Sequence, residues 1–205
     1  RRVLLNYDRQ SPMIHFYLLL ILSIFATSVE AKDSIIGDLS SKNISINTTF
    51  TGSQIIIFGS IKRNDNETII PSNIIIEVLG PKSNLVIHKK KKVLGIWINS
   101  NPTKIDDSLS FYSLLYTKKP ETILSKEEHI KTSIGKNKFF KSNNMQQQFL
   151  DAINAKIRIK SASGAYVFTN EPITLKEETL FSTEVSLPAN LTEGDYTAKI
   201  YLIQN

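Results

Sequence analysis

The chain has 205 residues, of which 41% are hydrophobic, and a formal net charge of +6. This apolar content is enough to build a packed core, so an intrinsically disordered chain is excluded. The lack of cysteine excludes disulfides, thiolate metal sites and cysteine nucleophiles, so stability must come from packing.

An export signal is predicted at the N-terminus. Residues 14–26 form an apolar run, and Val29 and Ala31 have the small side chains found before a signal-peptidase site. We therefore expect residues 1–31 to comprise an upstream segment plus a signal peptide that is cut after Ala31.

Two alternatives remain open for this segment. It would be an uncleaved anchor if it crossed the membrane, although a span needs about 20 apolar residues and this run is shorter. Met13 would be the true start if residues 1–12 were an upstream over-read, and the basic residues before the apolar run would then be lost.

Alternation of apolar and polar residues dominates residues 32–120 and predicts the β-rich part of a sandwich. Turn-forming residues separate the apolar runs, as at 51–53 and 80–83. The predicted strands are 43–50, 54–62, 73–80, 84–88, 93–99 and 109–117.

Residues 121–160 are predicted to be a helical connection. Ser125 and Glu128 have the spacing of a capping box, in which the two side chains satisfy each other's backbone amides at a helix start. Apolar residues then recur at helical spacing and predict a helix over 142–157.

Strands return in residues 161–205, which we expect to hold the C-terminal, incomplete strands of the sandwich. Over 178–188, Phe181, Thr183, Val185 and Leu187 share one face. A turn at Gly194 followed by a strand that begins at Tyr196 resembles the corner of an immunoglobulin-like sandwich. The predicted fold class is therefore mostly β, an immunoglobulin-like sandwich with a helical connection around 121–160.

The most distinctive stretch places four lysines between two apolar runs, with the chain's single tryptophan shortly after them; these residues are Lys89, Lys90, Lys91, Lys92 and Trp97. Neighbours in an extended chain point to opposite faces, so contiguous lysines suit nucleic acid poorly, and no nucleic-acid partner is expected. We favour a solvated charged turn, with the indole packed in the sandwich. A ligand or anionic-membrane contact through these five residues is the alternative.

No catalytic, cofactor-binding or metal-binding residue is predicted. His88 and His129 fall in different predicted elements, so neither has a partner suggested by spacing. The adjacent acids at 106–107 and 127–128 would diverge in regular structure, whereas a glycoside hydrolase needs carboxylates that face each other. We expect no enzyme activity and no cofactor.

Five stretches together resemble the family of alphaproteobacterial proteins described as putative transmembrane proteins, over residues 35–203. They are DLSSKNISINTTFTGSQIIIFGSI (38–61), IIIEVLGP (74–81), GIWIN (95–99), SFYSLLYTKKP (110–120) and LPANLTEGDYTAKIYL (187–202). The resemblance implies a signal peptide, an exported β-rich domain and a single C-terminal span. Because the chain stops at Asn205, we expect it to be a fragment that lacks this span.

The predicted function is that of an exported, membrane-associated protein without catalytic activity, on the periplasmic side of the bacterial inner membrane. It would be an accessory or interaction partner of a membrane protein, and the family's association with sulfite-exporter-like permeases, which the resemblance implies, suggests a transport complex. One alternative is an envelope glycan-binding module that uses exposed Trp97, Tyr112 or Tyr116. A carboxylate-based hydrolase is the second alternative.

Overall fold

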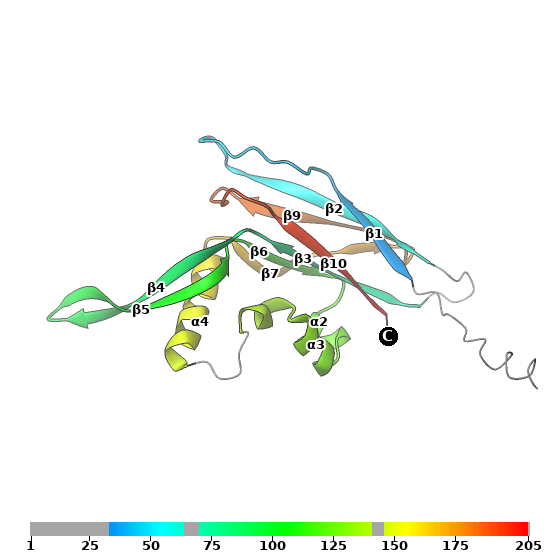
Figure 1. Ribbon diagram of the computed structural model, residues 1–205. Helices are drawn as coiled ribbons and strands as arrows, with labels where there is room; N and C mark the ends of the chain where they lie inside the picture. Colours follow the sequence, from blue (N-terminus) through cyan, green and yellow to red (C-terminus); the bar gives the residue numbers. More distant parts are fainter. Residues whose placement is uncertain (1–32, 64–69, 141–145, 205) are drawn as a thin grey trace, which may run out of the picture. The chain divides into compact units, whose positions relative to one another are not determined.

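The computed structural model describes residues 33–63, 70–140 and 146–204, all within the second of the chain's two units, which begins at Asp33. The predicted export signal lies outside the described residues. In the described part, alternating apolar runs form the strands, and the stretch between the sixth and seventh strands supplies the helices (Figure 1). The strands are β1 (Ser34–Leu39), β2 (Gly52–Lys62), β3 (Ser72–Leu79), β4 (Lys82–Val93), β5 (Ile96–Leu109), β6 (Tyr112–Tyr116), β7 (Tyr166–Pro172), β8 (Thr174–Lys176), β9 (Leu180–Pro188) and β10 (Thr197–Gln204). The helices are α2 (Pro120–Ile123), α3 (Lys126–Thr132), the 3-10 helix η1 (Gly135–Phe139) and α4 (Gln147–Ala162).

These strands form two four-stranded sheets and one two-stranded sheet within the described residues. The first sheet has the order β1-β2-β9-β8, the second has the order β10-β3-β6-β7, and β4 pairs only with β5. Neighbouring strands are antiparallel, except that β6 and β7 run parallel.

The two four-stranded sheets pack face to face around one apolar core. The core receives Ile57 from β2, Val185 from β9, Ile76 from β3 and Phe111 beside β6. Strand β9 shows why the register holds, because its inward residues 181, 183, 185 and 187 are all buried while Glu184 between them is exposed. Slipping β9 by one residue would turn this whole set outward.

A helical layer covers the opposite face of the second sheet. A second core joins Ile75 of β3 and Leu114 of β6 to Ile123 of α2, Phe139 of η1 and Ile153 of α4. Figure 1 shows these helices on the side of β3 and β6 that faces away from β1, β2 and β9. Covering on both faces explains why β3 is a nearly unbroken apolar run, since strands buried on both sides lose the alternation of a half-exposed strand.

Local chemistry fixes the start of α3 as predicted. The Ser125 hydroxyl accepts a 3.2 Å hydrogen bond from the Glu128 amide, and the Glu128 carboxylate accepts a 2.9 Å bond from the Ser125 amide. The hydrogen bonds that the Ser125 amide and hydroxyl donate to this carboxylate, first of all the one from the amide, hold the pKa of the Glu128 carboxyl below its usual value.

The mostly β class is confirmed, while the immunoglobulin-like arrangement itself stays a prediction. At the predicted corner, the Tyr196 hydroxyl donates a hydrogen bond to the Thr192 carbonyl at 2.8 Å. The strand predicted over 43–50 is wrong. The Asn47 side chain there accepts hydrogen bonds from the amide and hydroxyl of Thr49, and this local turn competes with strand pairing.

The prediction of a lysine turn is also wrong. Lys89–Lys92 lie inside strand β4, and the chain turns afterwards, at Leu94 and Gly95. The lysine side chains are exposed, as expected for a solvated segment. The two apolar runs on either side of the lysines therefore belong to one long hairpin.

Candidate functional site

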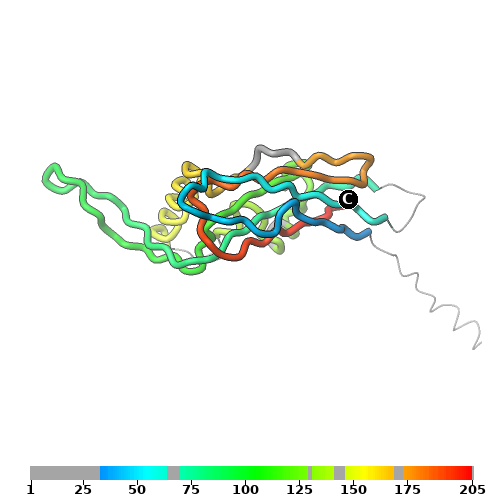
Figure 2. The backbone as a smooth tube through the Cα atoms, turned by 90° about the horizontal axis from the view of Figure 1, so that it is seen from above, coloured from blue at the N-terminus to red at the C-terminus, as the bar shows by residue number. Residues whose placement is uncertain are grey.

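Strands β4 and β5 form a hairpin that extends beyond the two packed sheets, and we call it the arm. Figures 1 and 2 both show the arm leaving the sheets and ending in a free tip. Near the sheets, β5 carries one extra residue at each of two bulges, between the pairs Ser83–Ser108 and Leu85–Ile105 and between Ile87–Thr103 and Lys89–Ser100. Bulges bend and twist a ladder, so they set the direction in which the arm leaves the body.

The tip of the arm is a two-residue turn with unusual chemistry. Leu94 and Gly95 both have positive φ, 48° and 87°, as the central residues of a type I′ turn do. Such turns favour Asn-Gly, because a leucine in this conformation costs about 1–2 kcal/mol. The Leu94 side chain is nevertheless 98% exposed, so packing against the described residues does not offset this cost.

Apolar side chains surround this turn on both faces of the ribbon. Cross-strand partners share a face, and the successive pairs Val93–Ile96, Lys92–Trp97 and Lys91–Ile98 therefore alternate between the two faces. Trp97 is 63% exposed, and the other large apolar residues of the tip, Val93, Ile96 and Ile98, are exposed as well. We call Val93–Ile98 the apolar tip, and its two hydrophobic faces cannot both belong to one core.

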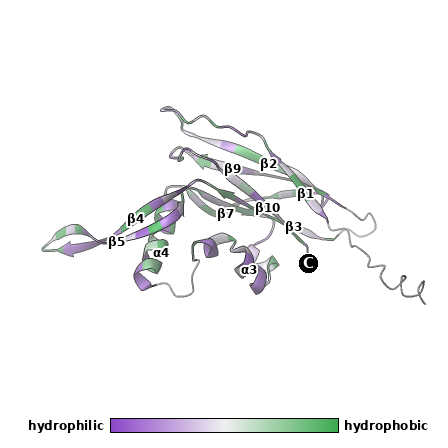
Figure 3. Cartoon of the chain, viewed as in Figure 1, coloured by the Kyte–Doolittle hydropathy of each residue, from purple (hydrophilic) through white to green (hydrophobic). Residues whose placement is uncertain are grey.

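Two of the four lysines lie beside the apolar tip, and the other two lie behind it. Lys91 and Lys92 sit directly across from Ile98 and Trp97, while Lys90 pairs with Asn99 and Lys89 with Ser100. Lys89 also makes a 3.7 Å ion pair with Asp151 of α4. Since no acidic residue occurs from Lys82 to Ile105, the whole outer arm is positively charged. Figure 3 shows hydrophobic and hydrophilic residues adjoining at this tip.

A groove of about 820 Å³ separates the inner arm from α4. Its charged side chains are mostly basic, namely Lys89, Lys90 and Arg158 against Asp151, and His88 also lines it. Gln148 of α4 donates a 3.0 Å hydrogen bond to the Thr103 hydroxyl and so joins the helix to the arm. This contact supports the inner arm beside α4 and leaves the tip uncovered.

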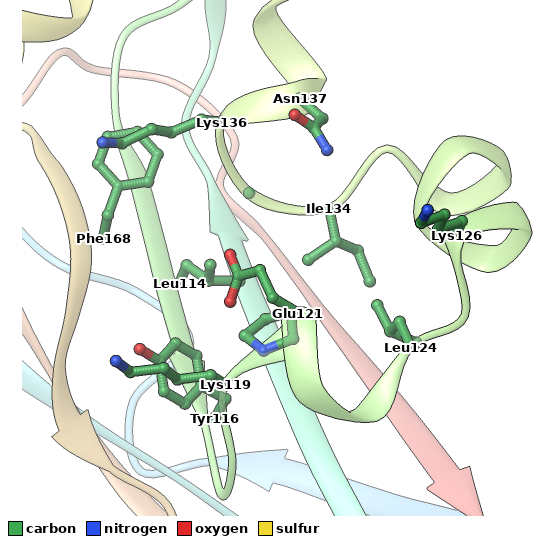
Figure 4. Close-up of a pocket in the computed structure, with 12 residues that line it drawn as sticks. Leu114, Tyr116, Lys119, Glu121, Leu124, Lys126, Ile134, Lys136, Asn137 and Phe168 are labelled. Atoms are coloured by element: carbon green, nitrogen blue, oxygen red, sulfur yellow. The ribbon is translucent and has the colours of Figure 1, made fainter.

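A second groove, of about 960 Å³, lies between the end of β6 and the short helices (Figure 4). Its floor is apolar, with Leu114, Ile134 and Phe168, and the Lys136 amine lies 5.4 Å from the centre of the Phe168 ring. Lys119, Lys126 and Glu121 stand at its rim. The rim thus has mixed charge, in contrast to the uniformly basic outer arm.

The buried ionisable groups are engaged in the second core. Glu77 is 0% exposed and accepts hydrogen bonds from the Tyr112 hydroxyl at 2.6 Å and the Tyr201 hydroxyl at 3.1 Å, and Lys138 lies 3.1 Å from the same carboxylate. Burial raises the pKa of the Tyr112 hydroxyl, and Glu77 raises it further. Burial raises the pKa of Tyr201 to about 12. The buried Lys156 amine lies 4.9 Å from the Phe139 ring centre, within cation–π distance.

The structure brings the predicted contact residues Lys89–Lys92 and Trp97 together on the arm. The interpretation of Trp97 as a packed residue is wrong, because the arm carries it away from both cores. The three aromatics predicted for a glycan-binding module do not form an exposed row, since Trp97 lies on the arm, Tyr112 is fully buried and Tyr116 is half-buried.

The acidic pairs serve local structure. Asp106 pairs with Lys104 at 2.9 Å, Asp107 lies 4.0 Å from Lys82 at a bulge, and Glu128 caps α3. His88 is exposed on the arm, and the side chain of His129 lies outside the description.

Sequence reasoning missed the other residues of the apolar tip. Leu94, Ile96 and Ile98 surround the turn together with Val93 and Trp97, and the sequence VLGIWI contains the signal that would have found them. Five apolar residues around one glycine have no alternation, so a hairpin turning at Gly95 must place hydrophobic groups on both faces.

The comparisons with known proteins place the chain in a family. None of the helices in residues 33–63, 70–140 and 146–204 has the length and apolar content that a membrane crossing requires. Searches of curated proteins and of solved structures returned no significant match. The model of one family matches residues 34–205, and the chain therefore belongs to the family described as "Putative transmembrane protein (Alph_Pro_TM)".

Proposed function

We propose that the chain is an exported, membrane-associated protein that works by contact and not by chemistry, on the periplasmic side of the bacterial inner membrane. The observation that carries this proposal is the arm, because it presents the apolar tip to solvent next to four lysines. Exposed apolar surface of this kind marks an interaction site on a folded protein.

Membership of a transmembrane family supports the membrane part of the proposal. The predicted signal peptide supports export, and the periplasmic face follows from export across the inner membrane. The partner would be a membrane protein, with a transport complex as the candidate that the family resemblance suggests.

The noncatalytic part is supported by what the buried charged groups do. Glu77, Lys138 and Lys156 all contact neighbours that hold η1 and α4 against the second sheet. These three side chains stabilise packing, and none of them lines either of the two grooves.

The location is tested in cells of an alphaproteobacterium that express the full chain with a C-terminal tag. We expect the protein in the inner-membrane fraction and expect added protease to remove the tag in spheroplasts. A cytosolic protein of similar size, tagged in the same way, is the control and should stay protected. Recovery of the tagged chain from the cytosol, protected from protease, would contradict the proposal.

The partner is tested by cross-linking in native membranes. We expect a recurrent product between the chain and one membrane protein, absent when an unrelated exported protein carries the same tag. Finding only products with soluble proteins, or none at all, would overturn the assignment to a membrane complex.

A further inference from the structure

We infer that the apolar tip inserts into the interfacial layer of a lipid bilayer with anionic headgroups, and that the lysines beside and behind it bind those headgroups. The inference rests on the proposed membrane association and names the surface that the arm contacts. It is carried by the geometry of the tip, by its charge and by the turn at Leu94.

The geometry suits a layered surface better than a pocket. The hydrophobic residues occupy the end of the ribbon and both of its faces, so a partner must surround the tip on all sides. From the turn to the Lys91–Ile98 pair, the ribbon extends about 10 Å at about 3.3 Å per residue. Interfacial apolar groups are buried about 5–10 Å into the boundary between headgroups and acyl chains, which matches this length.

The order of side chains along the arm also follows the order of layers in a membrane. Leu94 and Ile96 come first, and Trp97, a residue type that favours the level of the headgroups, follows at the same level as Lys92. Lys92 and Lys91 lie across from Trp97 and Ile98, and their long aliphatic stems allow the amines to reach outward to phosphate while the stems stay in apolar surroundings. With no acidic residue from Lys82 to Ile105, the charge complements an anionic surface.

The turn conformation indicates that Leu94 does not contribute to the stability of the fold. Asparagine would adopt the positive φ of residue 94 more easily than leucine does. Leu94 therefore weakens the hairpin, and its 98% exposed side chain gains nothing from the described part of the chain. Contact with hydrocarbon would offset this cost.

Trp97 is the only tryptophan of the chain, so its fluorescence reports on the tip in the full-length protein. The experiment titrates the full chain with vesicles of phosphatidylcholine alone or mixed with phosphatidylglycerol. Sedimentation alone would not locate the contact, because residues 14–26 are also apolar. We expect the Trp97 emission to shift to the blue with the anionic vesicles and much less with phosphatidylcholine alone.

Two variants of the tip test its parts separately, each beside a matched control. Leu94→Asn keeps the turn and removes the apolar group, and should weaken the interaction seen by Trp97 more than tenfold. Its control, Leu180→Asn, removes an exposed leucine from β9 and should change nothing. Lys91→Gln with Lys92→Gln should weaken binding to anionic vesicles roughly 30-fold, at about fivefold per lysine. The control pair, Lys118→Gln with Lys119→Gln, removes the same charge from an exposed site away from the arm.

The possible outcomes separate this inference from the proposed function. If the chain sediments with anionic vesicles while Trp97 emission stays unchanged, the tip does not insert, although membrane association stands. If Trp97 responds to native membranes and to neither kind of vesicle, the tip binds a membrane protein and the inference is wrong. If the Trp97 emission shifts equally with both kinds of vesicle, and if Lys91→Gln with Lys92→Gln does not change this shift, anionic headgroups play no part and that half of the inference is wrong. If the chain binds neither vesicles nor native membranes, the proposed function fails as well.

Discussion

Glu77 on β3 accepts a 2.6 Å hydrogen bond from the Tyr112 hydroxyl on β6, and both side chains are 0% exposed. Lys138 of η1 reaches the same carboxylate, so one buried charge joins two strands to the short helices. This network forms the polar centre of the core beneath the helical layer.

Removing the Glu77 carboxylate should destabilise the fold strongly. In Glu77→Leu, the largely buried Lys138 amine loses its counter-charge and Tyr112 loses its acceptor, so we expect a loss of about 3 kcal/mol in the free energy of unfolding. Urea unfolding followed by circular dichroism measures the loss. Glu184→Leu, at an exposed position on β9, is the control and should cost less than about 0.5 kcal/mol. Adding Lys138→Met to Glu77→Leu should recover part of the loss, and a purely additive result would contradict an ion pair.

Stability should fall at alkaline pH through the buried tyrosines. The folded-state pKa values of Tyr112, Tyr166 and Tyr201 are raised above the ordinary value near 10, first of all by burial. Below pH 10 both states hold these protons, so the stabilisation is fully present there. As pH rises above 10, the unfolded tyrosines ionise first and stability is lost, by up to about 1.4 kcal/mol per pH unit for each such group.

Tyr112→Phe provides the comparison, because it removes one of these titrating groups. Its free energy of unfolding, measured in urea from pH 9 to pH 11, should fall less steeply than that of the unchanged chain. Parallel slopes for the two proteins would mean that Tyr112 ionises as readily folded as unfolded, contrary to its burial.

Substitutions on either face of β3 should destabilise the fold, because the helical layer covers one face and the first sheet covers the other. Ile75 points to the core beneath the helices and Ile76 to the core between the sheets, and each is 0% exposed. We expect Ile75→Ala and Ile76→Ala each to cost about 2–5 kcal/mol in urea unfolding, as buried isoleucines do. Ile56→Ala on the outer face of β2 is the control and should cost much less. A small cost for Ile75→Ala would show that the helices do not cover this face.

Much of this fold could be predicted from the sequence because its cause is local. The alternation over 181–187 sets one face of β9, and the nearly unbroken apolar run in β3 reflects burial on both faces. Strand β1 is absent from the sequence-based prediction. The strand predicted over 43–50 is replaced by a turn at Asn47, because its side chain accepts hydrogen bonds from Thr49 and the apolar pattern carries no sign of this local competition.

The candidate site could be predicted only in part. The run of four lysines and the single tryptophan make Lys89–Lys92 and Trp97 stand out in the sequence. Their exposure, however, depends on how far the arm extends beyond the sheets. A two-stranded hairpin that extends away from the packed sheets needs no apolar face. Four consecutive lysines can therefore lie within a strand there, whereas a strand packed against the core could not contain them. The predicted turn falls on the lysines because their charge resembles a turn signal, whereas the conformational freedom of Gly95 decides where the chain turns.

Exchanging the strained turn residue should stabilise the arm. Leu94→Asn replaces leucine at a φ of 48° by a residue that adopts this conformation readily, so we expect local opening of the hairpin to become about 1 kcal/mol less favourable. Hydrogen exchange of the amides in β4 and β5 measures this opening. Faster exchange in the variant would mean that the leucine side chain supports the turn, and would argue against a tip that is kept apolar for contact.

The central claim is that the apolar tip meets lipid, and depth-dependent quenching of Trp97 tests it most directly. The full chain is mixed with phosphatidylglycerol vesicles whose acyl chains carry bromine either near the headgroups or near the bilayer midplane. We predict strong quenching by bromine near the headgroups and weak quenching by bromine at the midplane, because the arm reaches only the interface. Unquenched Trp97 in vesicles that carry the chain down on centrifugation would contradict the claim.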